Sequence, residues 1–478
     1  MSTPESFSPS DPTVKTPQIL ALDFLLDLDP LNLLQPNANT PTARVVQRYI
    51  ALVLYYETNG DKWNRLDMWL TGEHECNWYG ISCVELTISS TPILDDSSSG
   101  GGGGGLDQLT TQEDLVVQLQ LEQNNLAGNL PREVGFFTSC TILSLWGNTL
   151  VGVIPTTLGN MLPLTKLWLD DNELVGSIPS QVGRLRNVND MTLYSNQLSG
   201  SIPSELGNCA RLGRLWADTM MISGTLPTEL GNLQALTNLY LDVNELSGTL
   251  PSEMGLLTNL RDLRLFRNRM VGTIPLQLFS LSGLKIAYLD SNNLEGTLPS
   301  MARLSSIQDL QAFSNRLTGD IPLDVGTLST LLVLRLENND LTGTIPSLLG
   351  TSQALLRVTL SGNRLGGTIP SSLRFSLQMR RLQLDRNNLV GTIPTWVGQL
   401  TELQSLNLQA NRLTGAVPSE LGNLTNLNDL TLEQNNLTGT IPAQLCTVST
   451  LLILSSDCSG TAPAVTCDCC TMCQTPIQ

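Results

Sequence analysis

One pattern of apolar and polar positions repeats along most of the chain. Leucines alternate with other residues before an asparagine, and a glycine and a proline follow, so that the pattern reads L-x-L-x-x-N-x-L-x-G-x-I-P from Leu119 to Pro442. The asparagine stands at positions 124, 148, 172, 196, 244, 268, 292, 315, 339, 363, 387, 411 and 435. Met220 fills the vacant place, which gives fourteen units, with twelve steps of 24 residues and one of 23. A register this regular indicates stacked structural repeats.

Each unit predicts a short strand followed by a bend. The alternating leucines give the strand one inward face. At the bend, the asparagine side chain can bond backbone groups of its own coil and of the adjacent coil, while the glycine permits a turn and the proline restricts the chain after it. A single unit cannot bury its leucines, so the units stack, with strands about 4.8 Å apart in one parallel sheet. Both ends of such a stack need caps.

Met220 interrupts the row of asparagines. A methionine cannot bridge two coils, and the backbone groups that lose their partner would cost about 1–3 kcal/mol if they are buried dry. Two interpretations stay open: the methionine marks a kink or a ligand-specific feature, or it is a tolerated, water-filled defect in a cooperative array. The thirteen intact asparagines favour the tolerated defect.

The composition divides the chain into five segments. Residues 1–43 are rich in Ser, Thr and Pro and predict disorder, apart from one short acidic and apolar stretch. Residues 44–83 place apolar residues at helical spacing and predict a helical N-terminal cap. Residues 84–113 contain a run of six glycines and predict a flexible insertion. The repeats then fill residues 114–442, and a cysteine-rich C-terminal cap follows at 443–478.

The repeat, with its added GxIP segment, resembles the plant-type leucine-rich repeat. The preceding W…CNWYGISC segment is similar to the N-terminal cap of that family, with Trp69, Cys76, Trp78, Gly80 and Cys83 in matching places. The resemblance implies an α/β solenoid: a right-handed superhelix with a concave parallel β-sheet, a helical N-terminal cap and a cysteine-rich C-terminal cap. It also implies recognition and not catalysis.

The family comprises receptor-kinase ectodomains, receptor-like proteins and secreted inhibitors of wall-degrading enzymes such as polygalacturonase, and similar proteins occur in algae such as diatoms. Two features of this sequence depart from the family. It contains neither a kinase domain nor a run of eighteen apolar residues that would span a membrane, and the glycine-rich insertion separates the cap from the repeats.

Cysteines mark the two ends of the predicted solenoid. Cys140 and Cys209 stand at apolar places of the repeats and predict buried thiols. We expect the other cysteines to form disulfides, because short irregular caps need covalent closure. The alternative is a zinc site in CDCCTMC, which the spacing and the lack of a nearby histidine disfavour. The sequence does not fix the pairing of the expected disulfide cysteines, which are Cys76, Cys83, Cys446, Cys458, Cys467, Cys469, Cys470 and Cys473.

The cysteines and the N-terminus give opposite indications of the compartment. Disulfides indicate an extracellular or cell-surface protein, and Asn423 and Asn436 begin N-x-T triplets that predict glycosylation. The first residues, however, show no signal peptide. An incomplete gene model, a lost anchor or unconventional export would reconcile the two, and a cytoplasmic location is the alternative.

Charge and residue types exclude several function classes. The net charge of −17 argues against nucleic acid as a partner and disfavours anionic lipid. His74 is the one histidine, so a catalytic triad would have to use it, and its loop, TGEHEC, predicts a solvated residue instead. The glycine run lacks the Lys-Ser/Thr of a phosphate-binding loop. We therefore expect no enzymatic activity, cofactor or metal.

The residues between the leucines predict the binding surface. Leucines five and three places before each asparagine point inwards, so the residues four and two places before it point to the open face of the sheet. Repeats two to nine each carry one aromatic residue there, namely Trp146, Trp168, Tyr194, Trp216, Tyr240, Phe266, Tyr288 and Phe313. The charged residues in the same columns include Asp170, Asp218, Asp242, Asp290 and Arg264. The later repeats carry a mixed polar face instead, with Arg335, Arg357, Arg381, Arg386, Glu337 and Asp385.

Exposed aromatic residues flanked by carboxylates suit sugars or extended peptides. The sequence therefore predicts a non-enzymatic protein that binds an extracellular peptide, glycan or protein through the concave sheet, in a receptor-like or hydrolase-inhibitor-like role. The alternative is a structural or adhesive wall protein without one specific ligand. Two other interpretations concern single residues: the aromatics follow from strand propensity alone, or Asp218 and Asp242 hold Ca²⁺. The ligand and the oligomeric state stay open.

Overall fold

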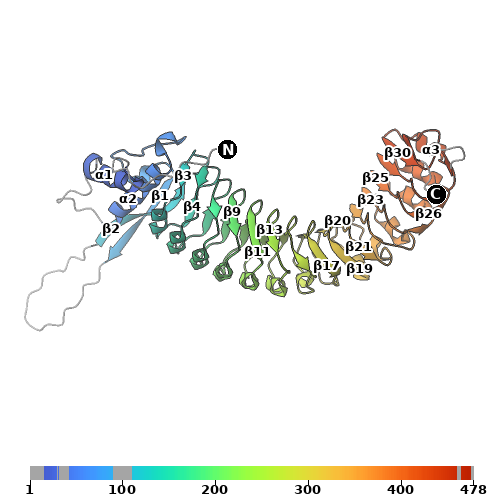
Figure 1. Cartoon of the computed structure of the whole chain (residues 1–478), viewed down its shortest axis with the longest axis horizontal. Helices are drawn as coiled ribbons and strands as arrows, with labels where there is room; N and C mark the ends of the chain where they lie inside the picture. Colours follow the sequence, from blue (N-terminus) through green and yellow to red (C-terminus); the bar gives the residue numbers. More distant parts are fainter. Residues whose placement is uncertain (1–14, 30, 32–41, 90–109, 460–463, 475–478) are drawn as a thin grey trace, which may run out of the picture. The chain divides into compact units, whose positions relative to one another are not determined.

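The computed structural model forms two compact units, Met1–Leu212 and Gly213–Gln478 (Figure 1). The division falls in the repeat in which Met220 takes the place of the asparagine. The residues that the structure describes are 15–29, 31, 42–89, 110–459 and 464–474.

Two helices begin the first unit. Helix α1 (Pro17–Asp23) continues into a π-helical turn, η1 (Phe24–Leu28), and packs against α2 (Thr42–Glu57). The Thr16 hydroxyl caps α1 by accepting from the Ile19 amide at 3.3 Å. Because the middle of α2 is apolar on all sides, it is buried on all sides, and this confirms the helical N-terminal region.

Buried charges tie the short acidic and apolar stretch to the cap. Arg48 on α2 is fully buried and donates from Nε and a terminal nitrogen to the two carboxylate oxygens of Asp29, both at 3.0 Å. Its guanidinium also lies 4.5 Å from the Trp78 ring. Two short 3-10 helices, η2 (Gly60–Lys62) and η3 (Glu75–Asn77), complete the cap.

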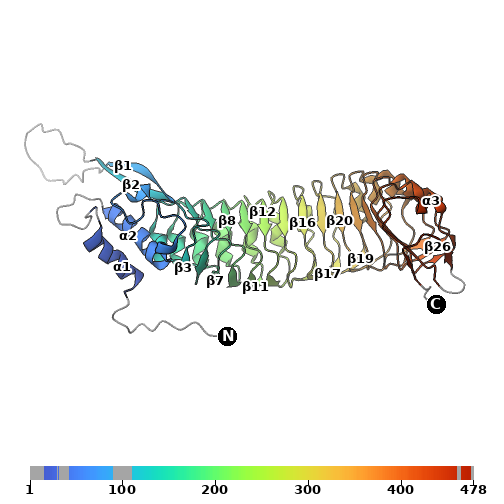
Figure 2. The ribbon, with the colours of Figure 1, turned by 90° about the horizontal axis from the view of Figure 1, so that it is seen from above.

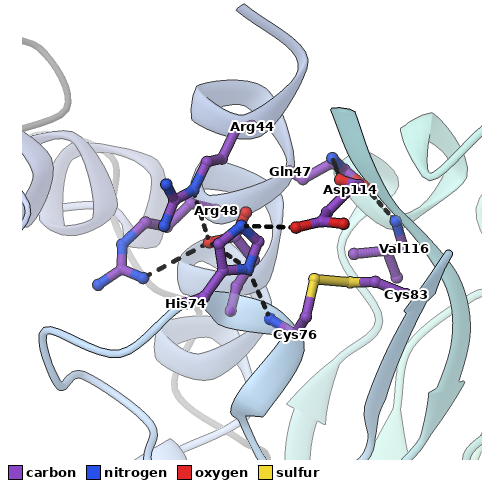
Figure 3. The surroundings of a disulfide bond; sticks show 9 residues. Arg44, Gln47, Arg48, His74, Cys76, Cys83, Asp114 and Val116 are labelled. Atoms are coloured by element: carbon purple, nitrogen blue, oxygen red, sulfur yellow. Dashed lines mark hydrogen bonds and ion pairs between the residues drawn. A yellow bond between two sulfur atoms is a disulfide. The ribbon is translucent and has the colours of Figure 1, made fainter. Parts of the chain in front are cut away.

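His74 is not the solvated loop residue that the sequence predicted. Its side chain is 24 % exposed, and Nε2 lies 3.5 Å from the carboxylate of Asp114. Nδ1 accepts from the Cys76 amide at 3.2 Å and lies 3.7 Å from the buried carboxylate of Glu75. Figure 3 shows the imidazole between Asp114 and the Cys76–Cys83 disulfide. Because Nδ1 accepts, Nε2 carries the proton and faces the carboxylate of Asp114, so tertiary contacts draw the side chain out of solvent.

A hairpin joins the cap to the repeats and corrects the expected extent of the insertion. Strand β1 (Ile81–Ser89) pairs antiparallel with β2 (Thr110–Gln120), from Ile81 opposite Leu119 to Ser89 opposite Thr110. Residues 84–89 and 110–113, which the sequence assigned to the insertion, therefore lie in strands. The segment VELTIS alternates apolar with polar residues and contains three β-branched ones, which favours a strand, and the glycine run further along the chain concealed that signal. Residues 90–109, with the glycine run, lie outside the described residues.

The repeats of the first unit build one parallel sheet on from β2. Strand β2 pairs with β4 (Ile142–Ser144), β4 with β6 (Lys166–Trp168) and β6 with β8 (Asp190–Thr192). Short strands form a second, narrower layer: β3 (Ala127–Asn129), β5 (Thr149–Val151), β7 (Val175–Gly176) and β9 (Gln197–Gly200). Five-residue 3-10 helices return the chain: η4 (Arg132–Phe136), η5 (Thr156–Asn160), η6 (Ser180–Arg184) and η7 (Ser204–Asn208).

The second unit repeats this plan. Each strand of its long sheet pairs in parallel with the next. The strands are β10 (Arg214–Trp216), β12 (Asn238–Tyr240), β14 (Asp262–Arg264), β16 (Ile286–Tyr288), β18 (Asp309–Gln311), β20 (Val333–Arg335), β22 (Arg357–Thr359), β23 (Arg381–Gln383), β25 (Ser405–Asn407), β27 (Asp429–Thr431), β30 (Ile453–Ser456) and β32 (Met472–Cys473). The leucines between the face residues are almost fully buried, so they form the core.

Short strands and turns complete each coil of the second unit. Figure 2 shows β12, β16 and β20 along one side of the ribbon and the short strands along the other. The short strands are β11 (Met221–Thr225), β13 (Glu245–Ser247), β15 (Val271–Gly272), β17 (Asn293–Thr297), β19 (Arg316–Asp320), β21 (Asp340–Thr342), β24 (Val390–Gly391), β26 (Arg412–Gly415), β28 (Asn436–Leu437), β29 (Gly439–Thr440) and β31 (Val465–Thr466). The returning helices are η8 (Thr228–Asn232), η9 (Ser252–Leu256), η10 (Leu278–Ser280), η11 (Leu323–Thr327), η12 (Leu349–Thr351), η13 (Ser371–Phe375), η14 (Thr395–Gln399), η15 (Ser419–Asn423) and α3 (Ala443–Cys446).

The asparagine row performs its predicted role. The side-chain nitrogen of Asn268 donates to the carbonyl of Leu265 in its own coil at 3.1 Å and to that of Leu241 in the preceding coil at 2.9 Å. Its side-chain oxygen accepts from the amide of Leu246 at 2.9 Å. Met220, in contrast, is 8 % exposed and packs as a core residue. Both interpretations of Met220 stay predictions.

Each end of the row has a terminal partner that the repeat pattern did not reveal. In the first unit, Asn124 accepts from the Arg65 amide at 2.6 Å and donates to the Arg65 carbonyl at 3.1 Å. In the second unit, the carboxylate of Asp457 accepts from the amides of Gln434 and Asn435 at 2.8 and 3.1 Å. Asp457 lies beyond the last consensus repeat, so the sequence pattern gave no signal for it.

The disulfides confirm the prediction for the cysteines. The bonds join Cys76 with Cys83, Cys446 with Cys469, Cys458 with Cys473 and Cys467 with Cys470. Cys140 and Cys209 are buried and unbonded. Burial raises the pKa of the Cys140 thiol to about 12 and that of Cys209 to about 11, so neither is a reactive thiolate at neutral pH.

Candidate functional site

The predicted binding residues lie on the sheet face of their own unit. In the first unit, Lys166 places its ammonium 4.8 Å from the centre of the Trp168 ring. Asp170 is 5 % exposed and accepts a hydrogen bond from the Thr192 hydroxyl. Trp146 and Tyr194 are half-buried on the same sheet. These residues stay a predicted part of the surface.

The second unit holds five of the predicted aromatic residues, and they form a packed layer. The rings of Trp216 and Tyr240 meet edge to face with centroids 5.4 Å apart, and those of Phe266 and Tyr288 lie 6.3 Å apart at a steep angle. All five, including Phe313, are half-buried. The rings are therefore only partly open to solvent, because neighbouring coils are close enough for the rings and long side chains to cover one another.

Arg264 holds the centre of this layer. Its guanidinium lies 4.4 Å from the ring centre of Tyr240 and 5.6 Å from that of Tyr288. It also donates to both carboxylate oxygens of Asp262, at 3.1 and 2.9 Å, and this carboxylate raises the pKa of Arg264. The Tyr240 hydroxyl donates to the same carboxylate at 2.8 Å. One charge pair thus fixes two rings.

Asp309 holds the next ring in the same way. The Tyr288 hydroxyl donates to it at 2.9 Å, and the Gln311 amide donates at 3.0 Å. Burial, with the neighbouring carboxylate of Asp309, raises the pKa of Tyr288 to about 12. Sequence reasoning missed Asp262 and Asp309. Both stand six places before an asparagine, a column that shares the face by the same alternation of two and would have revealed them.

Three aspartates at one place of the repeat are largely buried: Asp242 and Asp290, two places before an asparagine, and Asp218, two places before Met220. Asp242 is 7 % exposed, and no side chain of the described residues donates a hydrogen bond to it. Burial raises its pKa to about 7, and the charge of Asp218 adds to the effect. Burial also raises the pKa of Asp290 to about 6, although the Ser291 hydroxyl donates to it at 3.1 Å.

Asp218 completes this row of carboxylates. One of its oxygens accepts from the Thr219 hydroxyl at 2.9 Å, while Oδ1 is buried without a partner among the described residues. Burial raises its pKa as well. In the described part of the chain, no third candidate ligand joins Asp218 and Asp242, so the calcium interpretation gains no support. We name the whole surface the acid–aromatic face: Trp216, Asp218, Tyr240, Asp242, Asp262, Arg264, Phe266, Tyr288, Asp290, Asp309 and Phe313.

Comparison with known proteins identifies the family. Leucine-rich repeat models match residues 378–437 and 330–352. A leucine-rich repeat protein from Leptospira interrogans is 32 % identical over 67 % of this chain and 79 % of that chain, with a TM-score of 0.56. The chain belongs to the leucine-rich repeat family.

Plant ectodomains are also similar to this leucine-rich repeat protein. That of the Arabidopsis thaliana membrane receptor kinase GASSHO1/SCHENGEN3, in complex with CASPARIAN STRIP INTEGRITY FACTOR 2, is 32 % identical over 81 % of this chain and 49 % of that chain, with a TM-score of 0.63. The ectodomain of the Arabidopsis receptor kinase HAESA, in complex with an IDA peptide hormone ligand, is 28 % identical over 87 % of this chain and 69 % of that chain, with a TM-score of 0.62. The repeats are of the plant type.

Further findings concern the extent of the similarity and the lengths of the helices. The chain spans about half the length of the GASSHO1/SCHENGEN3 ectodomain that it matches, and no curated protein matches it. Within the described part of the chain, each helix is too short or too polar to cross a membrane.

Proposed function

We propose that this leucine-rich repeat protein binds an extended ligand on the acid–aromatic face of its second unit. The observation that carries the proposal is Asp242, a buried carboxylate to which no side chain of the described residues donates a hydrogen bond. Burying such a group destabilises the folded protein. Such an unfavourable group is typical of a binding site, because a bound ligand can donate the missing hydrogen bond.

The fixed rings support the same proposal. Tyr240, Arg264 and Tyr288 are already held by Asp262 and Asp309, so a ligand orders few side chains when it binds. Binding to a preorganised surface loses less conformational entropy. The face therefore resembles a recognition surface more than a set of strand-forming aromatics, because strand propensity alone requires no carboxylate on each hydroxyl.

Among the expected ligands, the geometry favours an extended peptide over a glycan. The edge-to-face rings of Trp216 and Tyr240 offer no pair of coplanar faces on which sugar rings stack. The carboxylates of Asp218 and Asp242 instead favour ligand groups that donate hydrogen bonds or carry positive charge, such as backbone amides and basic side chains. The HAESA ectodomain, which is similar over most of this chain, is in complex with a peptide hormone ligand.

Retention on peptide and glycan arrays tests the proposal. Asp242→Asn and Trp216→Leu are expected to abolish retention that the wild-type chain shows on peptides. The matched controls are Asp320→Asn, an exposed aspartate on β19, and Trp396→Leu on η14, and both are expected to retain the same peptides. Equal retention by all four variants rejects the acid–aromatic face as the site. If the wild-type chain is retained on glycans and not on peptides, the ligand is a sugar and not a peptide.

We also propose an extracellular, receptor-like role without catalysis. The four disulfides and the similarity to receptor ectodomains support it. Asn423 and Asn436 are both exposed and accessible for a glycan. Expression through a secretory pathway is expected to add two N-glycans that Asn423→Gln and Asn436→Gln each reduce by one, as mass spectrometry measures. An unmodified secreted chain contradicts the glycosylation, and reduced thiols in the isolated protein contradict the location.

A further inference from the structure

A basic stretch interrupts the acidic chain. Residues 341–384 contain five arginines and no aspartate or glutamate, although the net charge of the whole chain is −17. Two of these arginines are neutralised or covered. Arg364 forms an ion pair with Asp340 at 2.5 Å, and Arg374 lies 4.7 Å from the ring centre of Phe375. The remaining arginines include two on the long sheet, and these have a different environment.

Arg357 and Arg381 lie side by side on the sheet face. They begin the neighbouring parallel strands β22 and β23 and are partners in register, so their backbones are about 4.8 Å apart. Neither side chain forms a hydrogen bond or ion pair with another described residue. Two like charges at this separation repel each other, and the pair is therefore unfavourable unless a counter-charge is present.

The two acids whose charges act on Arg357 each accept from other side chains, although Oε2 of Glu337 is buried without a partner among the described residues. Glu337 accepts from Arg335, and Asp309 accepts from Tyr288 and Gln311. Burial lowers the pKa of Arg357, and the charges of Arg381 and Arg335 lower it further. The balance of charge around Arg357 is thus positive although acids lie in neighbouring coils.

Uncharged donors extend the arginine pair into a small patch. Thr359 and Gln383 are also partners in register, two residues further along the same strands and on the same face. Their hydroxyl and amide can donate hydrogen bonds, like the guanidinium groups. Two cations and two neutral donors in a square of adjacent positions, with no carboxylate among them, favour a ligand that has several acceptor oxygens and negative charge.

We infer that Arg357 and Arg381 together bind an oxyanion, namely a carboxylate, sulfate or phosphate group carried by a partner molecule. The guanidinium plane presents paired N–H donors whose spacing matches the oxygens of such groups. One oxyanion between the two arginines replaces their repulsion by two charge-assisted contacts. The site is distinct from the acid–aromatic face and does not rest on the proposed function.

Thermal unfolding of the full chain in different salts tests the inference. Sulfate, phosphate and acetate are each titrated at constant ionic strength against chloride, so that general screening is the same in every sample. At least one of the three oxyanions is expected to raise the unfolding midpoint of the wild-type chain to a plateau, as specific binding to the folded state does. The anion with the largest shift distinguishes a sulfate, a phosphate and a carboxylate partner.

Three variants make the experiment specific. Arg357→Gln and Arg381→Gln are each expected to weaken the apparent affinity for the best oxyanion about tenfold. Arg364→Gln removes an equal charge from the same stretch but from a paired arginine, and it is expected to keep the wild-type affinity. Identical shifts in oxyanion and chloride, or wild-type affinity in both Arg357→Gln and Arg381→Gln, overturn the inference.

A separate control keeps the two proposals apart. Asp242→Asn is expected to leave oxyanion binding unchanged, because Asp242 lies just after β12 and the charges that act on it do not include the arginine pair. If this variant loses retention on the peptide array and still binds the oxyanion, both sites act independently. If it loses oxyanion binding as well, the arginine pair is not a site of its own, and the inference fails while the proposed function stands.

Discussion

The second unit carries two contrasting stretches on one sheet face. From β10 to β18 the face is aromatic and acidic, and its arginine, Arg264, is held by Asp262 and two tyrosine rings. From β22 to β23 the face is basic, and no carboxylate of the described residues forms a hydrogen bond or ion pair with Arg357 or Arg381. Apart from Met220, which follows β10, the same row of asparagines and a buried apolar core lie beneath both stretches. The contrast shows that the repeat fixes where side chains stand, while the face columns decide their chemistry.

The largest expected effect tests whether the scaffold is equal under both stretches. Asn268→Met and Asn363→Met each remove four side-chain hydrogen bonds to backbone groups of two coils. Each variant is expected to lose about 1–3 kcal/mol of unfolding free energy, because buried backbone groups are left without partners. Chemical denaturation measures the loss. A loss that differs strongly between the two variants breaks the comparison, since the face residues would then affect the scaffold.

The next effect concerns Asp242 and pH. Its pKa is about 7 in the folded chain and near 3.8 when unfolded, so the folded state binds more protons between these values. Stability therefore falls as pH rises from about 4 to about 7. Asp242→Asn cannot titrate, and it is expected to be more stable than wild type by on the order of 2 kcal/mol at pH 8, with a smaller difference at pH 5. Denaturation midpoints at both pH values give the difference, and a gap that shrinks as pH rises contradicts the buried carboxylate.

The paired arginine of the first stretch gives a smaller effect. Arg264→Gln leaves Asp262 with a neutral partner and removes the cation from the Tyr240 and Tyr288 rings. We expect a loss of about 1–2 kcal/mol of unfolding free energy. Arg267→Gln, an exposed arginine in the same coil, is the control and is expected to change stability little. An equal change in the two variants shows that the ring contacts do not stabilise the face.

The unpaired arginine of the second stretch gives the smallest effect, with the opposite sign. Arg381→Gln in chloride at low ionic strength removes one of two repelling charges, and it is expected to raise stability by a few tenths of a kcal/mol. Added salt screens the repulsion and removes the difference. A clear loss of stability in Arg381→Gln shows that the arginine has a partner in the folded chain. The two stretches would then not differ in the pairing of their arginines.

Particular residues show how far sequence reasoning reached. The asparagine spacing predicted the coils, and the cysteine positions predicted the disulfides, because both follow from local periodicity and from the need to close the ends of a stack. The same reasoning missed Asp457, since it replaces an asparagine outside the consensus. It assigned residues 84–89 to the insertion, because the glycine run concealed a strand signal.

The face residues show the limit more clearly. Alternation placed Tyr240 and Asp242 on the open side of the sheet, and in the structure Tyr240 is half-buried and Asp242 is buried. It did not reveal that the rings are half-buried or that Asp262 joins them, because exposure depends on how long side chains of adjacent coils cover one another. His74 differs from its prediction for the same reason, since residues distant in the sequence surround it.

The sequence by itself determined the repeat, the parallel sheet, the core leucines and the terminal disulfides. These features depend on the period of the chain and on burial, which a regular pattern records. Only the tertiary structure decided which charges are paired. Arg264 and Arg381 each flank the inward leucine of a strand, yet Arg264 contacts two rings and a carboxylate, whereas Arg381 stands beside a second arginine. Electrostatic partners are set by distances between coils in space, and no period in the sequence encodes those distances.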